Sequence, residues 1–341
     1  MLTVMLNQHP EILSTSEEPF VLYFYPKYKY KTRWTEQEID QFLEEFWLLS
    51  EKSLDIYFDT RQNFRRVLLA HKDQCNFGQL CQLTYTHFLP PKDKTPVTVI
   101  IDKQIKYIYH LRRVMQLMPD AKFVVLVRDY RDVIAAWQRR KLGQSQTTAF
   151  LAKVWQIAYS QVLPFLTRQD PRFMLVRYED LVRQPQETLI RICSFVGKTF
   201  CPEMLDFHHS AAIFFHDAQT QHSDPVFVEK LRRFHSNMLE PLSTDHIGKG
   251  GKSLNQQDLA IANHICQPLA RHLGYLPYND DVQTSLTDNK VLLSGKVLSF
   301  RDRLRVFRAW FSRKVYLRGY VEAPFWLKVW IKKYRPNKIE P

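Results

Sequence analysis

The chain has 341 residues, of which 45% are hydrophobic and 24% are charged, a composition typical of a globular protein that excludes an intrinsically disordered one. The length suits one large domain or two small ones. The formal net charge of +13 is concentrated in residues 290–341, which hold 14 Lys and Arg against 3 acidic residues, so the rest of the chain is close to neutral.

The pattern of cysteines and apolar residues bears on where the protein works. The cysteines are 5 in number, an odd count, and none forms a CxxC pair, which fits a reducing compartment better than a disulfide framework. No apolar run is as long as a membrane span, and the first residues lack the basic region and cleavage site of a signal peptide. We therefore expect a cytoplasmic protein that could also be peripheral to a membrane.

The first elements are a short helix and a polar turn. The apolar residues of segment 2–6 share one face of a helix, and the helical pattern ends near residues 7–10. Residues 14–20, STSEEPF, predict a turn because Pro19 biases Glu18 away from a helical conformation. The Glu18 carboxylate would then project from a loop, either as a general base or as one of a solvated acidic pair.

Residues 34 to about 89 predict a helical block, since apolar side chains such as Phe42 and Phe46 recur every three to four positions. Between the strands of an α/β domain, such a block could be a lid or a cap over an acceptor site, or it could be ordinary core. His87 precedes a Pro-Pro turn and has no evident partner in the sequence, so we interpret it as structural.

Three apolar runs rich in β-branched residues predict buried strands, at residues 97–102, 123–127 and 173–176. Helical patterns separate them, and this alternation predicts an α/β domain with a parallel sheet and flanking helices. Lys103 closes the first of these strands. A lysine is rare at a buried strand end unless it meets an anion.

Arg128 follows the second predicted strand directly and precedes a helical pattern. This edge of an open α/β sheet is where ligands bind, and the amides that begin a helix suit anions. A guanidinium there can hold a phosphate through two parallel hydrogen bonds. The alternative is an ion pair at the surface with Asp129 or Asp132.

The second half of the chain predicts further helices and a basic loop. Pro185 is suited to begin a helix that Gly197 ends, and a helix over 256–273 follows the segment IGKGGK, residues 247–252, which predicts a flexible basic loop. Histidines 208, 209 and 216 have no carboxylate or cysteine cluster beside them, so we expect no metal site.

The C-terminal tail, residues 281–341, is basic and aromatic, with apolar residues such as Phe300 and Leu304 at helical spacing and arginines around them. This composition suits an interfacial helix on an anionic membrane surface. It also suits a helix packed on the rest of the protein. We do not expect a nucleic-acid partner.

Three segments together carry a resemblance to a known family. Residues 126–137, LVRDYRDVIAAW, resemble the 3′-phosphate-binding segment of sulfotransferases that use 3′-phosphoadenosine-5′-phosphosulfate (PAPS). Residues 176–197 and 246–275 are similar to later segments of that family, in the same order. The resemblance implies a P-loop-like sulfotransferase domain over residues 1–280, with the helical block inserted at about 34–89.

The resemblance also implies roles for individual residues. Arg128 would bind the 3′-phosphate, and Arg177 and Tyr178 would lie near the nucleotide. Lys249, and after it Lys252, would contact the phosphates. Those two lysines come from a loop that closes over the nucleotide in the family.

For catalysis, the resemblance places Lys103 at the transferring sulfonate and the leaving phosphate. Glu18 resembles the base of the tyrosylprotein and bacterial-type branch. The cytosolic branch has a catalytic histidine where this chain has Ile105, which favours the Glu-based branch. The implied function is transfer of a sulfonate group from PAPS to a hydroxyl or amine of a sugar, lipid, peptide or small metabolite, without a metal.

Two departures from the family pattern point to weaker activity. No glycine precedes Gly78, so we expect the first strand and the loop that binds the 5′-phosphosulfate to be missing. Ala136 stands where the family has a serine that also binds the 3′-phosphate. The alternative function is therefore a degenerate, inactive sulfotransferase-like protein that binds its ligands and is tethered by its basic tail.

Overall fold

A computed structural model describes residues 1–16, 20–54, 58–89, 94, 96–140, 147–208 and 240–275, together with residues 300, 304 and 307. The chain divides into two compact units. The first unit comprises Met1–Ala121, Val196–Pro241 and Val315–Pro341, and the second comprises Lys122–Phe195 and Leu242–Lys314. The predicted domain boundary near residue 280 lies outside the described residues and stays a prediction.

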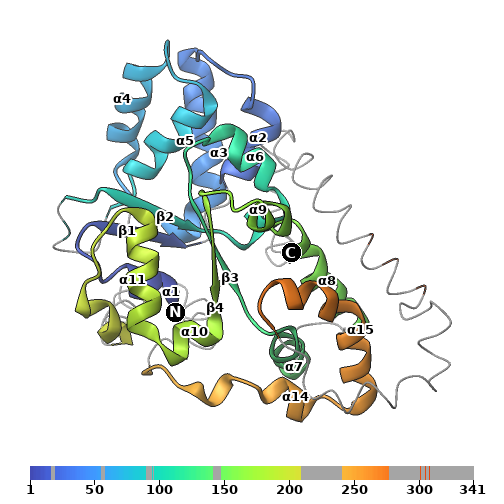
Figure 1. Cartoon of the computed structure of the whole chain (residues 1–341). Coiled ribbons are helices and arrows are strands. Elements are labelled where there is room, and N and C mark those ends of the chain that lie inside the picture. Colours follow the sequence, from blue (N-terminus) through green and yellow to red (C-terminus); the bar gives the residue numbers. More distant parts are fainter. Residues whose placement is uncertain are drawn as a thin grey trace. The chain divides into compact units, whose positions relative to one another are not determined.

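The first unit contains one parallel pair of strands and a group of helices (Figure 1). Its elements are α1 (Leu2–Leu6), β1 (Ile12–Ser16), α2 (Phe20–Tyr28), α3 (Glu36–Leu54), α4 (Arg61–His71), α5 (Phe77–Thr86), β2 (Val99–Lys103), the 3-10 helix η1 (Ile105–Tyr109), α6 (Leu111–Leu117) and the 3-10 helix η2 (Pro202–Asp206). Strand β1 pairs with β2 in parallel, with Ser16 opposite Lys103. The prediction of a polar turn from residue 14 onward is wrong for its first part, because residues 14–16 belong to β1.

The second unit also contains one parallel pair of strands among its described residues. Its elements are β3 (Phe123–Val127), α7 (Tyr130–Arg140), α8 (Thr148–Ser160), α9 (Leu163–Thr167), β4 (Phe173–Arg177), α10 (Tyr178–Arg183), α11 (Pro185–Val196), the 3-10 helix η4 (Thr244–His246), α14 (Lys249–Ser253) and α15 (Gln256–His272). Figure 1 shows β3 beside β4, and α15 packed along α8. The predicted strands and helices of this unit are confirmed, except that residues 249–253 of the predicted loop form α14.

The helical block of residues 34–89 packs around an aromatic core. Helix α2 supplies Phe20 and Phe24, α3 supplies Phe42 and Phe46, and all four side chains are fully buried. Their ring centroids lie 5.0–5.9 Å apart in edge-on, tilted and stacked pairs, an arrangement that aromatic rings favour. The helical stripe of the sequence is therefore core, and the same cluster of buried side chains includes Leu13 of β1.

A second core lies within the second unit. It buries Val127 at the end of β3 together with Tyr130 and Ile134 of α7, and residues of α8 and α15 such as Trp155 and Leu269. The Trp155 indole donates to the carbonyl of Arg128 over 3.0 Å, so the residue that follows β3 is attached to this core by its backbone.

Of the C-terminal tail, three described residues are helical and exposed, Phe300 at 81%, Leu304 at 41% and Phe307 at 55% of their surface. The predicted roles of the tail otherwise concern residues outside the described part. Among the helices that the structure describes, none is both long and apolar enough to cross a membrane.

Candidate functional site

Arg128 lies where β3 ends and α7 is about to begin, as the sequence predicts. Its guanidinium stacks on the Tyr178 ring, with the guanidinium carbon 4.5 Å from the ring centroid. One terminal nitrogen donates to the carbonyl of His246. Burial raises the pKa of the Tyr178 hydroxyl, and the charge of Arg128 opposes this rise. The ring and the carbonyl thus orient the guanidinium without neutralising it.

Arg131 and Arg172 are paired closely with carboxylates, whereas Arg128 has only a long ion pair. Arg131 binds Asp129 through two nitrogens, and Arg172 binds Asp170 in the same way. For Arg128, the closest carboxylate oxygen among the described residues belongs to Asp132, 3.9 Å away. Its Nε is buried and has no hydrogen-bond partner in the described part of the chain. Of the two predicted ion-pair partners, Asp132 does pair with Arg128 at this longer distance, whereas the carboxylate of Asp129 is paired with Arg131.

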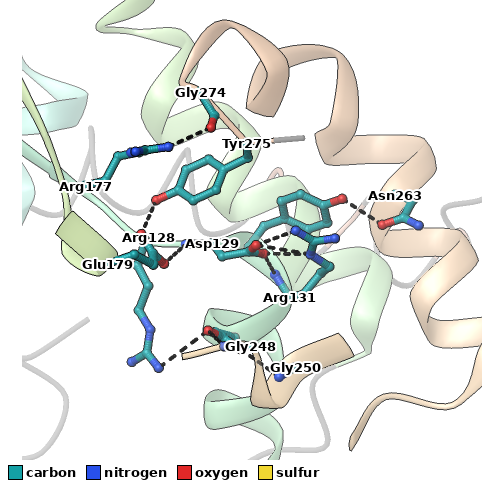
Figure 2. Close-up of polar contacts among 12 residues, drawn as sticks. Arg128, Asp129, Arg131, Arg177, Glu179, Gly248, Gly250, Asn263, Gly274 and Tyr275 are labelled. Carbon is teal, nitrogen blue, oxygen red and sulfur yellow. Dashed lines mark hydrogen bonds and ion pairs between the residues drawn. The ribbon is translucent and has the colours of Figure 1, made fainter. Parts of the chain in front are cut away.

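The amides of the glycine loop are occupied by a carboxylate of α7. Asp132 accepts the backbone N–H of Gly248 over 2.8 Å and that of Gly250 over 2.6 Å, and its side chain is only 2% exposed. Figure 2 shows the Arg128 side chain running toward Gly248. These bonds hold the segment before α14 beside the guanidinium.

Both glycines are required by the backbone. Gly248 has a φ of 74°, in the left-handed region that favours glycine. At Gly250, a Cβ atom would lie 2.1 Å from the carbonyl carbon of Arg131 and 2.4 Å from the backbone nitrogen of Asp132. Only a residue without a side chain lets α14 approach α7 this closely.

Lys249 and Lys252 lie on α14, and both are exposed. Lys249 is the first residue of this helix and directly follows Gly248, so its ammonium group belongs to the segment that Asp132 holds next to Arg128. Neither lysine forms a salt bridge within the described residues. The structure thus adds two exposed positive charges to the segment beside the guanidinium.

Arg177 is engaged differently from Arg128. It binds the carboxylate of Asp180 through two nitrogens, at 2.8 and 2.7 Å, and donates to the carbonyl of Gly274 over 2.9 Å. The bond to Asp180, against some loss of solvation, raises the pKa of its guanidinium. Figure 2 shows Arg177 reaching toward Gly274, whereas Arg128 extends toward Gly248. In this structure Arg177 fastens the start of α10 to the residues that follow α15.

A buried glutamate ties these segments together. Glu179 accepts the backbone N–H of Asp129 over 3.0 Å and the hydroxyl of Tyr275 over 2.7 Å. Burial and the Glu179 charge raise the pKa of Tyr275, which keeps its hydroxyl a donor. The backbone next to Arg128 is therefore fixed by α10 and by the residues that follow α15.

Of the two predicted catalytic residues, the structure describes Lys103, in the first unit. Lys103 is the last residue of β2 and lies opposite Ser16, the last residue of β1. Glu18 follows two positions later but lies outside the described residues. Burial, together with the charge of nearby Lys103, lowers the pKa of the Met1 amino group to about 6, so Lys103 lies close to the start of α1.

Two histidine predictions have different outcomes. His87 does have a partner, because its Nδ1 lies 2.8 Å from the Asp59 carboxylate, and their backbones are also hydrogen-bonded. The sequence pattern missed this pair because the two residues are 28 positions apart. Of the three later histidines only His208 is described, and in the part of the chain that the structure covers no His, Cys, Asp and Glu side chains gather as a metal site.

Sequence reasoning missed how Arg128 is supported, because it considered Asp132 only as an ion-pair partner and did not consider Glu179 or Gly250. Asp132, Glu179 and Gly250 act over separations of 50 or more positions, and only the tertiary fold brings them together. One signal was present: Asp132 lies in the first turn of a helix and two adjacent glycines lie in the later basic loop. Read together, they indicate a carboxylate that meets free amides.

The comparison with protein families decides what kind of protein this is. The profile described as "Sulfotransferase family" matches residues 1–202, which is more than half of the chain. The chain belongs to the sulfotransferase family. Its fold is α/β, with parallel strands flanked by helices, as the sequence predicts.

Individual relatives are distant from this sulfotransferase-family chain. Protein-tyrosine sulfotransferase 2 of Gallus gallus is 26% identical over 171 residues, which cover 48% of this chain and 43% of the relative. The chain therefore spans less than half the length of that curated relative.

Among solved structures, the sulfotransferase domain of the Synechococcus PCC 7002 olefin synthase matches with a TM-score of 0.49 at 21% identity, covering 81% of this chain and 90% of that one. The sulfotransferase domain from the curacin biosynthetic pathway matches with a TM-score of 0.42 at 18% identity, covering 79% and 92%.

Proposed function

We propose that this protein transfers a sulfonate group from PAPS to a hydroxyl or amine acceptor. The observation that carries the proposal is the state of Arg128. It is oriented by Tyr178 and by the carbonyl of His246, yet its buried Nε has no partner among the described residues. A buried donor without a partner costs free energy, which an anionic ligand can recover.

In this proposal the second unit binds the 3′-phosphate. Arg128 supplies two parallel donors, and Lys249 and then Lys252 add positive charge from α14. One face of the Tyr178 ring holds the Arg128 guanidinium, and the other face can contact the base of the nucleotide. Arg177, the other residue predicted near the nucleotide, contributes in this proposal by fixing the start of α10, where Tyr178 is the first residue.

The proposed chemistry rests on Glu18 and Lys103, whose roles the family resemblance implies. Sulfonate transfer resembles phosphoryl transfer, an in-line displacement in which positive groups stabilise the developing charge. Glu18 takes the proton of the attacking hydroxyl, the new S–O bond forms, and the bond to the bridging oxygen of PAPS breaks. Lys103 stabilises the negative charge that collects on that oxygen as adenosine 3′,5′-bisphosphate leaves.

The acceptor is a hydroxyl or amine, and sugars, lipids, peptides and small metabolites all provide one. The name of the Gallus gallus relative states that it acts on protein tyrosine. A tyrosyl hydroxyl in a peptide is therefore the first acceptor to test, with labelled PAPS as donor.

The central experiment measures binding of adenosine 3′,5′-bisphosphate by calorimetry. Arg128→Ala should weaken it by about 2–4 kcal/mol, the loss expected for a charge-assisted pair. The matched control is Arg172→Ala, because Arg172 precedes β4 at its opposite end and is already paired with Asp170. Binding of 5′-AMP, which lacks the 3′-phosphate, should respond much less to Arg128→Ala. Equal losses for both nucleotides, or no loss for either, would reject the assignment.

A second candidate function is a sulfotransferase-like protein that binds nucleotide without turnover. Two observations favour it: Asp132 already occupies the amides of Gly248 and Gly250, and Ala136 provides no hydroxyl for the 3′-phosphate. A lost hydroxyl–phosphate bond costs on the order of 1.5–3 kcal/mol. Binding that depends on Arg128, combined with no sulfonate transfer to any acceptor class, would favour this second function.

A further inference from the structure

Next to Lys103 in the sequence, the first unit contains a carboxyl group surrounded by hydroxyl groups from three other elements. The Oδ2 atom of Asp102 accepts from the Tyr85 hydroxyl of α5 and from the Tyr107 hydroxyl of η1, each over 2.5 Å. The Oδ1 atom accepts from Thr15 of β1 over a longer 3.4 Å. Nothing in the proposed chemistry uses this cluster.

The hydrogens of the cluster can be arranged for either charge state of Asp102. The two tyrosine oxygens lie 3.0 Å apart, and either can be the donor. When Asp102 is ionised, both hydroxyls donate to Oδ2. When Asp102 is protonated, its carboxyl group donates to one tyrosine hydroxyl. That hydroxyl donates to the other tyrosine, and the other tyrosine donates to the carboxyl group. Since both arrangements pair every hydrogen, a proton can enter or leave without stranding a buried polar group.

Among the groups that contact Asp102, the carboxyl group is the titrating member. The Met1 amino group near Lys103, whose pKa is lowered to about 6, titrates in the same range and does so equally in both proteins compared below. Burial raises the pKa of Tyr85 and of Tyr107 well above the ordinary value, and it does the same for Cys81 of α5, whose charge state would affect Tyr107. Burial also raises the pKa of Asp102, to about 6, against the opposing effect of its hydroxyl donors and of Lys103. Thr15 does not titrate.

Asp102 and Lys103 are electrostatically coupled but lie on opposite faces of β2. Thr15 is opposite Asp102 in the strand register, whereas Ser16 is opposite Lys103, and successive side chains of a strand alternate between faces. The face of Asp102 is the one covered by α5 and η1. Asp102 therefore does not meet a ligand at Lys103, but its charge weakens the attraction of Lys103 for an anion.

We propose that the Tyr85–Asp102–Tyr107 cluster is a proton-holding site that sets how strongly Lys103 attracts the anionic donor. Asp102 is a positioning residue that acts through Lys103. When the cluster holds a proton, Asp102 carries no charge and does not offset the positive charge of Lys103, so the donor binds more tightly. When the proton leaves, the Asp102 carboxylate offsets part of that charge. This inference rests on the proposed role of Lys103.

The experiment compares binding of adenosine 3′,5′-bisphosphate between pH 5 and pH 8 in the full chain and in Asp102→Asn. The variant copies the neutral state and retains an acceptor oxygen. It should bind about three- to tenfold more tightly than the unchanged protein at pH 7.5, the effect of removing one nearby unit charge. The two proteins should converge near pH 5, where Asp102 is protonated. Because both bind the same ligand, its own phosphate titration cancels.

Three further measurements separate the outcomes. Lys103→Ala should weaken binding, and Asp102→Asn should have a smaller effect in the Lys103→Ala background, because the anion is then no longer held beside Asp102. The Asp102 carboxyl carbon, followed by NMR, should titrate near pH 6, and Tyr107→Phe should move that midpoint upward because it removes a donor to the carboxylate. These readouts do not depend on turnover.

The possible contradictions are distinct. If Lys103→Ala weakens binding but Asp102→Asn weakens it too or leaves it unchanged, the inference is overturned and the proposed function stands. If Lys103→Ala has no effect, the proposed role of Lys103 falls, and the inference falls with it. A carboxyl midpoint near the ordinary value for aspartate would also overturn the inference, whatever the binding data show.

Discussion

The bonds between Asp132 and the glycine loop permit a prediction with a worked magnitude. Asp132→Ala removes the acceptor of two backbone amides, those of Gly248 and Gly250, at 2.8 and 2.6 Å. A hydrogen bond to a charged group contributes roughly 1.5–3 kcal/mol, and a simple sum for two gives about 3–6 kcal/mol. Gly248 is exposed, so water can replace the carboxylate there, whereas Gly250 is buried. We therefore expect a local loss of about 2–4 kcal/mol.

The assay is hydrogen exchange at the amides of residues 248 and 250, read in peptides that cover 246–254. A loss of about 2–4 kcal/mol corresponds to roughly 30- to 1,000-fold faster exchange at Gly250, because each 1.4 kcal/mol is tenfold. The exchange rate in Asp132→Asn should lie between those of the unchanged protein and Asp132→Ala, since the single carbonyl oxygen of Asn can accept from only one of the two amides. Asp245→Ala is the matched control, because Asp245 is an exposed aspartate on the adjacent turn.

Unchanged exchange at Gly250 in Asp132→Ala would refute the reasoning, because it would mean that the carboxylate does not hold the loop. Faster exchange throughout the second unit, rather than in this segment, would show instead that Asp132 stabilises the unit as a whole. If the loop is released, Arg128 should also lose its bond to the His246 carbonyl, which lies in the same segment.

Four other outcomes are expected. Gly250→Ala should lower the free energy of unfolding of the second unit by more than about 2 kcal/mol, because the new Cβ would lie 2.1 Å from the carbonyl carbon of Arg131. An unchanged urea midpoint would contradict this close approach. Arg177→Ala should lower the free energy of unfolding by about 1–2 kcal/mol, reduced because its side chain is 39% exposed; no change would show that its bonds to Asp180 and to the segment after α15 are not maintained. Asp102→Asn should flatten the dependence of stability on pH between pH 4 and 6. The folded pKa of about 6 exceeds the unfolded value of about 3.9, so the stabilisation that is present below pH 4 is lost as the pH rises through 6, by on the order of 3 kcal/mol. The full chain should sediment with anionic vesicles and be released by salt, whereas a chain without residues 290–341 should not; a deletion that unfolds the protein would favour a packed tail.

The strands and most helices could be predicted from the sequence because their signals are local. Continuous β-branched runs correspond to β2, β3 and β4, and the helix that begins at Pro185 ends before Gly197, which has a φ of 82°. Strand β1 was missed since its residues, ILSTS, are mostly small and polar, and only parallel pairing with β2 makes them a strand. Local propensity does not decide a strand whose partner lies more than 80 residues away.

The place of Arg128 is likewise a local property, because a buried strand that ends at a helix start puts that residue at the ligand-binding edge of the sheet. What the sequence could not determine is which arginine remains available. Arg131 and Arg177 are as basic as Arg128, and all three have aspartates within a few positions.

Only the tertiary structure decides between them. The fold gives Asp129 to Arg131 and Asp180 to Arg177, and it directs Asp132 to the amides of a loop that follows more than 100 residues later. The physical reason is that a close pair with two parallel hydrogen bonds requires a carboxylate at hydrogen-bond distance and in the right orientation, which Arg131 and Arg177 have and Arg128 does not. Spacing along the chain sets neither condition, whereas the packing of α7, α10 and α14 sets both.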